Sequence, residues 1–282
     1  MNAPKDFFVG YLPPSLQVRR DCVRLLVVLL LTALLVALFA SGLQRSSGMG
    51  TWDLSQERRI SGYLTLDPYP VLHYVGKERH AVILVQEGKY AATTLAEPYA
   101  GRWVSVSGHA IERGDWRMLE LSAEAAFEPL NEHAFPPPDV APKALDQVEL
   151  TGEIIDSKCF LGAMKPGAGK AHRACAWLCL AGGIPPMFVV KSANGDAAGE
   201  YRGFLLVDNQ GHSAAEQLAR HVATPLRLSG TLETRGTLPY IRLHDAPLAH
   251  LAAEELADYG ATIFNDADNT LVCNSRTRAR VY

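Results

Sequence analysis

The sequence lacks any excess of basic residues. Its 27 lysines and arginines are outnumbered by 30 aspartates and glutamates, which gives a formal net charge of −3 at pH 7. Proteins that bind nucleic acid draw much of their affinity from clustered lysines and arginines that neutralise phosphates. A nucleic-acid partner is therefore not expected. The content of apolar and charged residues, 48% and 20%, is ordinary for a globular protein.

Several familiar cofactor and catalytic motifs are also missing. The sequence has no Cys-x-x-Cys-His, so covalent attachment of haem c is not supported. The stretch from Met164 to Ala171 has the length of a nucleotide-binding P-loop, but Met164 stands at the first glycine and Ala171 replaces the Ser or Thr. Nucleotide binding is therefore not expected. We find no Ser-His-Asp arrangement and no paired carboxylates that would favour a hydrolase.

Cysteine is scarce, yet three of the five cysteines lie within 21 residues, beside a histidine. His172, Cys175 and Cys179 have the spacing i, i+3, i+7, which places them on one face of a helix. A glycine-rich loop can return Cys159 to that face, and Asp156 is a candidate acceptor for one nitrogen of His172. Three thiolates and an imidazole complete the tetrahedral coordination of a closed zinc or copper(I) site. We therefore predict a Cys3His metal site with a zinc or copper ion.

Two other interpretations of this cluster stay open. A single disulfide would pair Cys159 with Cys175 or Cys179, because two cysteines four residues apart on a helix cannot form a relaxed bond. The third thiol would then be redox-active, and the protein would be a thiol–disulfide oxidoreductase using Cys175 or Cys179. Alternatively, the bridge only stabilises a structural scaffold. A closed four-ligand site has no position for a substrate, so the metal interpretation predicts an accessory protein rather than an enzyme.

A long uncharged segment, Leu25–Leu43, lies near the N-terminus. As a helix it would be about 28 Å long, enough to cross the hydrocarbon core of a bilayer. Four basic residues precede it, whereas Arg45 is the only one in the next dozen, so residues 1–24 are predicted to stay in the cytosol. A cleaved signal peptide is the alternative. The apolar run is longer than in typical signals and Leu38-Phe39-Ala40 is a poor cleavage site, which favours an anchor.

The remaining chain repeats a pattern of short alternating strands. Residues 52–129 form the first set, a proline-rich linker spans 130–147, and the second set spans 148–247. Ile60-Ser-Gly matches Leu150-Thr-Gly, and Val106-Ser-Gly matches Leu228-Ser-Gly at an offset that is 32 residues larger. This difference equals the length of segment 157–188, which holds the cluster. The second set therefore reads as a copy of the first with an insertion.

The fold class that follows is mainly β. We predict one N-terminal transmembrane helix and two tandem small β-barrels of OB-like type, the second with a helical Cys/His insertion. Two β-sandwich domains are the alternative. Residues 248–257 have the pattern of an amphipathic helix, so 248–282 is predicted to be a C-terminal helix and tail.

The cluster and its surroundings resemble a motif of poorly characterised bacterial envelope proteins, which are described as membrane or OB-like proteins. The matching residues are Gly152-Glu-Ile-Ile-Asp-Ser-Lys-Cys-Phe-Leu-Gly162, Met164-Lys-Pro-Gly167 and His172-Arg-Ala-Cys-Ala-Trp-Leu-Cys179. The resemblance implies a bacterial envelope location and a special role for the Cys/His set, but no defined reaction. With the predicted topology it places the anchor in the inner membrane and the barrels in the periplasm.

Two partners are expected. One is the lipid bilayer, through the single transmembrane helix. The other is an envelope protein, to which the barrels would dock through a cationic loop that contains Lys158, Lys165, Lys170 and Arg173. The alternative, that these charges only keep the loop soluble, stays open.

Overall fold

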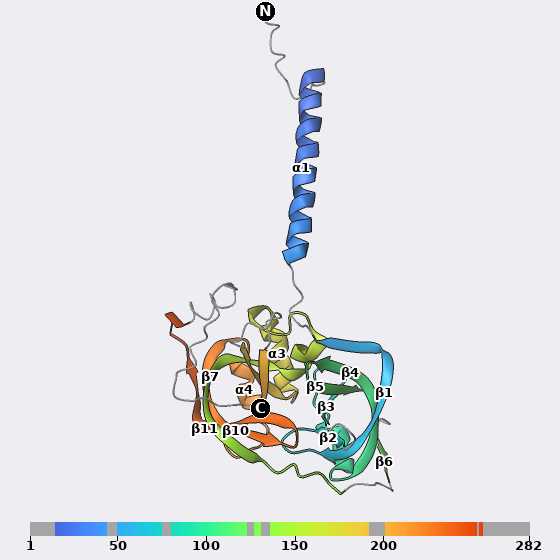
Figure 1. Ribbon diagram of the computed structural model, residues 1–282, viewed down its shortest axis with the longest axis vertical. Coiled ribbons are helices and arrows are strands. Elements are labelled where there is room, and N and C mark those ends of the chain that lie inside the picture. Colours follow the sequence, from blue (N-terminus) through green and yellow to red (C-terminus); the bar gives the residue numbers. More distant parts are fainter. Residues whose placement is uncertain are drawn as a thin grey trace, which may run out of the picture. The chain divides into compact units, whose positions relative to one another are not determined.

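The structure, a computed structural model of the full chain, describes residues 15–43, 50–74, 80–122, 127–130, 136–191, 201–252 and 254–255. It divides into two compact units (Figure 1). The first unit, residues 1–46, contains helix α1; the second, residues 47–282, contains all the strands and is called the head below.

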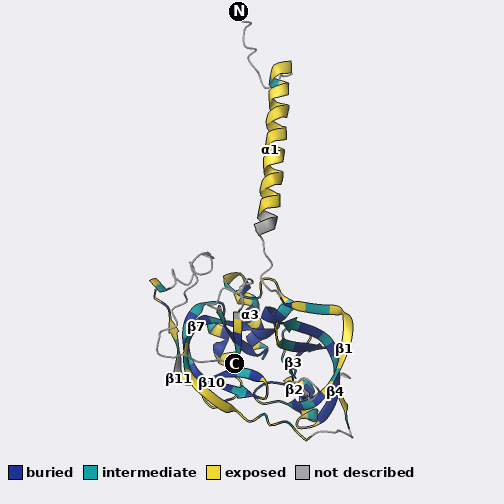
Figure 2. Ribbon diagram, in the orientation of Figure 1, coloured by how far each residue is buried: buried dark blue, intermediate teal, exposed yellow. Residues whose placement is uncertain are grey.

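Helix α1 spans Leu16–Leu43 and begins earlier than the predicted span, because Ser15 caps its first turn by accepting a hydrogen bond from the backbone N–H of Val18. Residues 16–24 of the predicted cytosolic stub are therefore helical. Within α1, Leu16–Phe39 is long and apolar enough to cross a membrane. Its large apolar side chains are exposed (Figure 2). Length and composition suit a membrane span or a signal sequence.

The first half of the head is a closed five-stranded barrel. Its strands are β1 (Thr51–Thr65), β2 (Val71–Tyr74), β3 (His80–Gln86), β4 (Trp103–Arg113) and β5 (Trp116–Leu121). They pair in the order β1-β2-β3-β5-β4, and β4 returns to β1; only the β3–β5 pair is parallel. Two short helical turns, α2 (Thr93–Ala96) and η1 (Glu97–Tyr99), connect β3 to β4, and β6 (Phe127–Pro129) extends the sheet at β4.

The second half repeats this order. Its strands are β7 (Lys143–Asp156), β8 (Pro186–Lys191), β9 (Tyr201–Val207), β10 (Pro225–Arg235) and β11 (Leu238–His250). They close as β7-β8-β9-β11-β10, with β9 and β11 parallel and the turns α4 (Ala215–Leu218) and η5 (Ala219–His221) before β10. Two small closed barrels with one topology confirm the predicted mainly-β, OB-like fold, and the β-sandwich alternative is wrong.

The glycines that align the two sequence repeats occupy equivalent, crowded positions. A Cβ on Gly62 in β1 would lie 2.7 Å from the carbonyl oxygen of His73, and one on Gly152 in β7 would lie 2.4 Å from that of Val189. Each barrel thus closes through a point where the first strand meets the second with no room for a side chain. The repeated Ser-Gly or Thr-Gly is a consequence of barrel closure.

The connection between the first two strands differs between the barrels. In the first barrel five residues, 66–70, join β1 to β2. In the second, residues 157–185 lie between β7 and β8 and form the π-helical turn η3 (Cys159–Ala163), the 3₁₀ turn η4 (Lys170–His172) and helix α3 (Arg173–Ala181). We call residues 157–185 the insertion. The structure has it where the sequence predicted it, except that residues 186–188 already belong to β8.

Two predicted boundaries need correction. Strand β7 begins at Lys143, so residues 143–147 of the expected linker are strand. The helix predicted from Leu248 is wrong at its start, because residues 248–250 continue β11 and Leu248 pairs with Leu228 of β10. The backbone ladder with β10 outweighs the helical spacing of the apolar side chains. Of the later residues, only 254 and 255 are described as helical, and 256–282 lie outside the described residues.

Each barrel has a hydrophobic cluster of its own, and a third cluster joins the two barrels. Tyr69, from the first barrel, donates a hydrogen bond to the carbonyl of Leu206 and accepts one at 3.1 Å from the backbone N–H of Ala214, both in the second half. A single buried cluster contains residues of both barrels and also Cys159 and Cys179. Buried residues accordingly lie in both barrels and beneath α3 in Figure 2.

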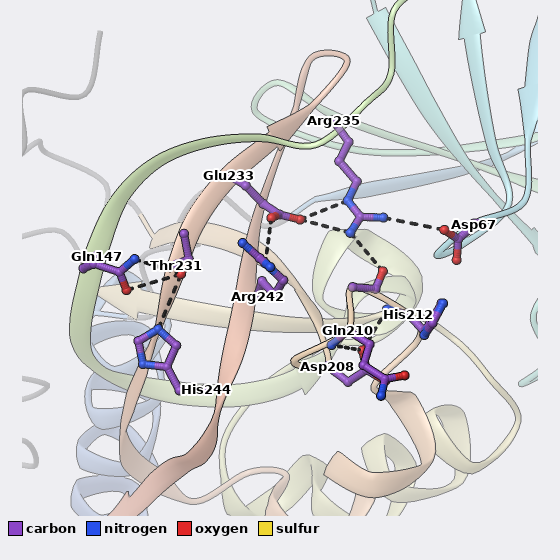
Figure 3. Close-up of polar contacts among 11 residues, drawn as sticks. Asp67, Gln147, Asp208, Gln210, His212, Thr231, Glu233, Arg235, Arg242 and His244 are labelled. Carbon is purple, nitrogen blue, oxygen red and sulfur yellow. Dashed lines mark hydrogen bonds and ion pairs between the residues drawn. The ribbon is translucent and has the colours of Figure 1, made fainter.

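A buried ion pair lies at the same junction (Figure 3). Arg235, 8% exposed, donates to Glu233, 1% exposed, at 3.0 Å and to the carbonyl of Gly211 at 2.9 Å. The same guanidinium lies 3.9 Å from the carboxylate of Asp67 in the first barrel. Because the pair is satisfied on several sides, its burial is tolerated, and Arg235 also faces Asp67 across the contact between the barrels.

Candidate metal centre

The insertion folds over the end of β7. Asp156, the last residue of β7, accepts a hydrogen bond at 2.8 Å from the backbone N–H of Cys159, which starts η3. Further along, the backbone N–H of Gly169 donates to Glu153 at 2.6 Å, and η4 then leads into α3. Helix α3 ends at Ala181, before Gly182-Gly183. These contacts bring the two ends of the insertion together above β7.

His172 is held by Asp156. Its Nε2 lies 2.8 Å from a carboxylate oxygen of Asp156, and both side chains are fully buried. An ionised carboxylate only accepts hydrogen bonds, so Nε2 carries a proton, and in the neutral ring Nδ1 then has a free lone pair. Nδ1 is buried and has no hydrogen-bond partner in the structure. The contact predicted between Asp156 and His172 is confirmed, and it has the form in which metal-binding histidines are usually oriented.

The three thiols meet around Cys159. The donor atoms of Cys159, His172 and Cys175 all lie within 4.8 Å of one another, and so do those of Asp156, Cys159 and Cys179. The structure thus brings all four predicted residues into one cluster, as two overlapping sets of three rather than one set of four. This Cys/His cluster could hold a metal ion.

The distance between two of the sulfurs suits a metal better than a disulfide. The Sγ atoms of Cys159 and Cys175 are 3.7 Å apart. Two sulfurs bound to one tetrahedral zinc at about 2.3 Å lie roughly 3.8 Å apart, whereas bonded sulfurs lie about 2.05 Å apart. All four cysteines in the described part of the chain, including Cys22, are free. Cys273 lies outside the described residues.

Lys89 completes the cluster from the first barrel. Its Nζ donates to Cys175 Sγ at 2.7 Å and to Cys179 Sγ at 3.5 Å. The loop that carries Lys89 is clamped to the end of α3, because the N–H of Ala91 donates to the carbonyl of Gly182 at 2.9 Å. A Cβ on Gly182 would lie 1.8 Å from the carbonyl oxygen of Lys89. No sequence signal points to Lys89, which is 86 residues from Cys175 and in the other repeat.

Lys89 and the buried thiols of Cys159 and Cys179 change one another's pKa values, and of these two thiols only Cys179 is shifted toward the thiolate. Burial lowers the pKa of Lys89, but its hydrogen bond to Cys175 and the nearby thiolate charges outweigh this effect and raise the pKa overall. The hydrogen bond between Cys159 and Cys179 raises the pKa of Cys159, as does burial, and the same bond lowers the pKa of Cys179. These directions make Cys159 the donor and Cys179 the acceptor of their hydrogen bond. A metal ion would have to displace the proton of Cys159.

Lys158 is buried, contrary to the expectation that it belongs to an exposed cationic loop. It was predicted to be part of a cationic docking loop, but it is 3% exposed and forms an ion pair with Glu120 of β5. Its Nζ also donates to the carbonyls of Gln86 and Gly88, at 2.8 and 2.7 Å. Lys158 therefore holds the loop that presents Lys89. The other three cations of the predicted loop are exposed: Lys165, Lys170 and Arg173.

A cavity of about 490 Å³ adjoins the cluster on the side of Cys159 and Cys179. Its walls come from both barrels and include Trp52, His109 and Met164. Most of this lining is apolar. The cluster is therefore reachable from outside on one side, although the sulfurs of Cys159 and Cys179 are largely buried.

Comparisons with known proteins add little to this geometry. No protein-family model matches the chain, and no curated protein matches it. A solved structure of a deletion mutant of the single-stranded DNA binding protein from Thermus aquaticus is similar over 72% of this chain and 96% of that chain, with 13% identity and a TM-score of 0.21. A likeness this weak supports no inference about this chain. The resemblance of the Cys/His motif to bacterial envelope proteins stays a prediction.

Proposed function

We propose that this protein is a membrane-anchored envelope protein that holds a soft metal ion in a Cys3His centre and serves as an accessory subunit. The observation that supports the metal most strongly is His172. Its Nδ1 is buried without a partner while Asp156 fixes the ring through Nε2. A buried polar atom left without a partner costs about 1–3 kcal/mol, and a bound metal would satisfy it.

Four residues would hold the ion. The donor atoms of Cys159, His172 and Cys175 lie within 4.8 Å of one another, and Cys179, which shares a second such set with Cys159, would supply the fourth ligand. Three thiolates and an imidazole suit zinc or copper(I), which favour sulfur and nitrogen and accept four-coordinate sites. A zinc ion with three thiolates has a net charge of −1, which the ammonium of Lys89 would balance. Such an ion would either stabilise the insertion or be passed to a partner.

The location follows from α1. Its apolar stretch is long enough to span a bilayer, and the basic residues Arg19, Arg20 and Arg24 at its start favour an N-terminus in the cytosol. The head would then be periplasmic, in accord with the resemblance to bacterial envelope proteins. The cavity beside Cys159 would be the route by which an envelope partner gives or receives the metal.

A thiol–disulfide oxidoreductase is the second candidate, and the two neighbouring free thiols of Cys159 and Cys175 support it. Cys159 and Cys175 are close enough, at 3.7 Å between sulfurs, to bond after a small movement. Their oxidation would release two protons and pass two electrons to a partner disulfide, with Lys89 stabilising the Cys175 thiolate. This differs from the sequence interpretation, which assigned the reaction to Cys175 or Cys179.

One purified preparation distinguishes the metal centre from the oxidoreductase. The full chain is purified anaerobically in detergent, its metal content is measured, and its thiols are counted before and after denaturation. The proposed centre requires one zinc or copper per chain, lost on Cys159→Ser, Cys175→Ser or His172→Gln. Cys22→Ser, at an exposed cysteine outside the cluster, is the matched control and should keep the metal. A metal-free chain with a reversible disulfide would instead establish the oxidoreductase.

A further inference from the structure

Helix α3 buries its sulfur-bearing face and turns an aromatic residue outward. Cys179 and Ala176 are buried, whereas Trp177 is 48% exposed and Leu178 is 47% exposed. These two residues line a shallow hollow together with Lys170 and Arg173. We call Lys170, Arg173, Trp177 and Leu178 the α3 surface. A tryptophan is usually buried for most of its area, so one exposed beside a leucine marks a contact surface.

All the charged residues of the insertion are basic. Residues 157–185 contain no aspartate or glutamate, although the whole chain has 30 of them. Lys165, Lys170 and Arg173 are exposed, and Lys158 is neutralised by its buried pair with Glu120. The α3 surface is therefore cationic on a protein whose net charge is −3, and its charge complements an anionic occupant.

The covalent connection to α1 limits how far the insertion can be from a membrane. The described part of the head begins at Gly50, whose backbone packs against η3: a Cβ there would lie 1.6 Å from the carbonyl oxygen of Leu161. Six residues separate Leu43, the end of α1, from Gly50. Fully extended, this connection reaches at most about 25 Å. If α1 spans a bilayer, the contact of Gly50 with η3 stays within that distance of the end of α1.

We infer that the α3 surface docks on the anionic phospholipid headgroups of the membrane in which α1 is anchored. Trp177 and Leu178 enter the interfacial region, where tryptophan is favoured, and Lys170 and Arg173 contact lipid phosphates. This inference rests on the proposed anchor. An acidic protein would satisfy the charges equally well, but the short tether and the tryptophan favour lipid. Docking would hold the Cys/His cluster close to the bilayer, beside partners that are also anchored.

The test measures whether Trp177 touches lipid in the full chain. The protein is reconstituted in vesicles of phosphatidylcholine alone or with about 30% phosphatidylglycerol, with bromine on the acyl chains as quencher. The difference in fluorescence between the wild type and Trp177→Phe gives the Trp177 contribution. That contribution should fall roughly twofold in the anionic vesicles and much less in the neutral ones. The double variant Lys170→Glu, Arg173→Glu should abolish the fall.

A matched control reverses two exposed charges outside the insertion, Arg102→Glu and Lys143→Glu, and should quench like the wild type. Vesicle flotation in the same samples reports the anchor separately. Flotation with an unquenched Trp177 overturns this inference and leaves the anchor intact, whereas failure to float removes both. A third outcome would assign the α3 surface to an acidic protein instead of lipid. In that outcome Trp177 is not quenched, and an envelope protein copurifies with the wild type but not with the Lys170→Glu, Arg173→Glu variant.

Discussion

Lys89 of the first barrel donates a hydrogen bond to Cys175 of the second, with 2.7 Å between Nζ and Sγ. The Cys/His cluster is therefore completed across the contact between the two barrels, although all its cysteines lie in one of them. The hydrophobic cluster that joins the barrels and the hydrogen bonds of Tyr69 with Leu206 and Ala214 hold that contact in place. The duplicated fold gives the cluster a counter-charge that a single barrel would lack.

The first prediction concerns this counter-charge. Lys89→Met removes the ammonium that balances a zinc ion with three thiolates, so zinc affinity should fall about tenfold, equivalent to about 1.4 kcal/mol. Competition with a chromophoric chelator measures the change. Lys143→Met, at an exposed lysine that pairs with Asp139, is the matched control and should bind zinc like the wild type. Unchanged affinity in Lys89→Met would show that Lys89 does not support the metal.

The second prediction concerns the orientation of His172. Asp156→Asn keeps an oxygen for the N–H of Cys159 but removes the carboxylate that fixes the imidazole. Metal affinity should fall about 10–100-fold, as is usual when a carboxylate behind a metal-binding histidine is lost. Circular dichroism should be unchanged. Glu149→Gln, at an exposed carboxylate of the same strand, should have no effect on affinity, and an equal loss there would contradict the assigned role of Asp156.

The third prediction concerns His73, which is buried at the contact between the barrels. Burial lowers its pKa to about 4, against 6.5 for an exposed histidine. Between these two values the unfolded chain binds more protons than the folded one, so stability falls as the pH drops from about 6.5 towards 4. The loss from pH 7 to 4.5 should be about 2 kcal/mol by urea unfolding. It should shrink in His73→Gln but not in His244→Gln, whose histidine is exposed.

The fourth prediction concerns barrel closure. Gly152→Ala would place a Cβ 2.4 Å from the carbonyl of Val189, so β7 and β8 must separate. We expect a loss of about 3 kcal/mol or more in the free energy of unfolding. Gly114→Ala, where nothing lies within 4 Å but φ is +55°, should cost only about 1 kcal/mol of backbone strain. Equal costs in thermal unfolding would contradict the argument that close approach requires the glycine.

The repeated strands and the cluster could be predicted because each has a local signature. Alternating apolar residues and the glycines of barrel closure repeat in the sequence, and His172, Cys175 and Cys179 have the spacing of one helix face over about two turns. Lys89 could not be found this way, because its contact with Cys175 depends on how one barrel packs on the other. The same packing explains why the prediction for Lys158 was wrong. A lysine is expected to lie in solvent, but Lys158 is buried in an ion pair with Glu120 of the other barrel.

The coordination of a bound metal tests the central claim most directly. X-ray absorption at the metal edge, on the anaerobically purified full chain with its metal-to-protein ratio measured, reports the ligands themselves. The account predicts about one ion per chain and, for zinc, three sulfurs at about 2.3 Å with one nitrogen at about 2.0–2.1 Å. The nitrogen shell should disappear in His172→Gln. A chain that binds no zinc or copper, or binds it only through oxygen and nitrogen, would contradict the Cys3His centre.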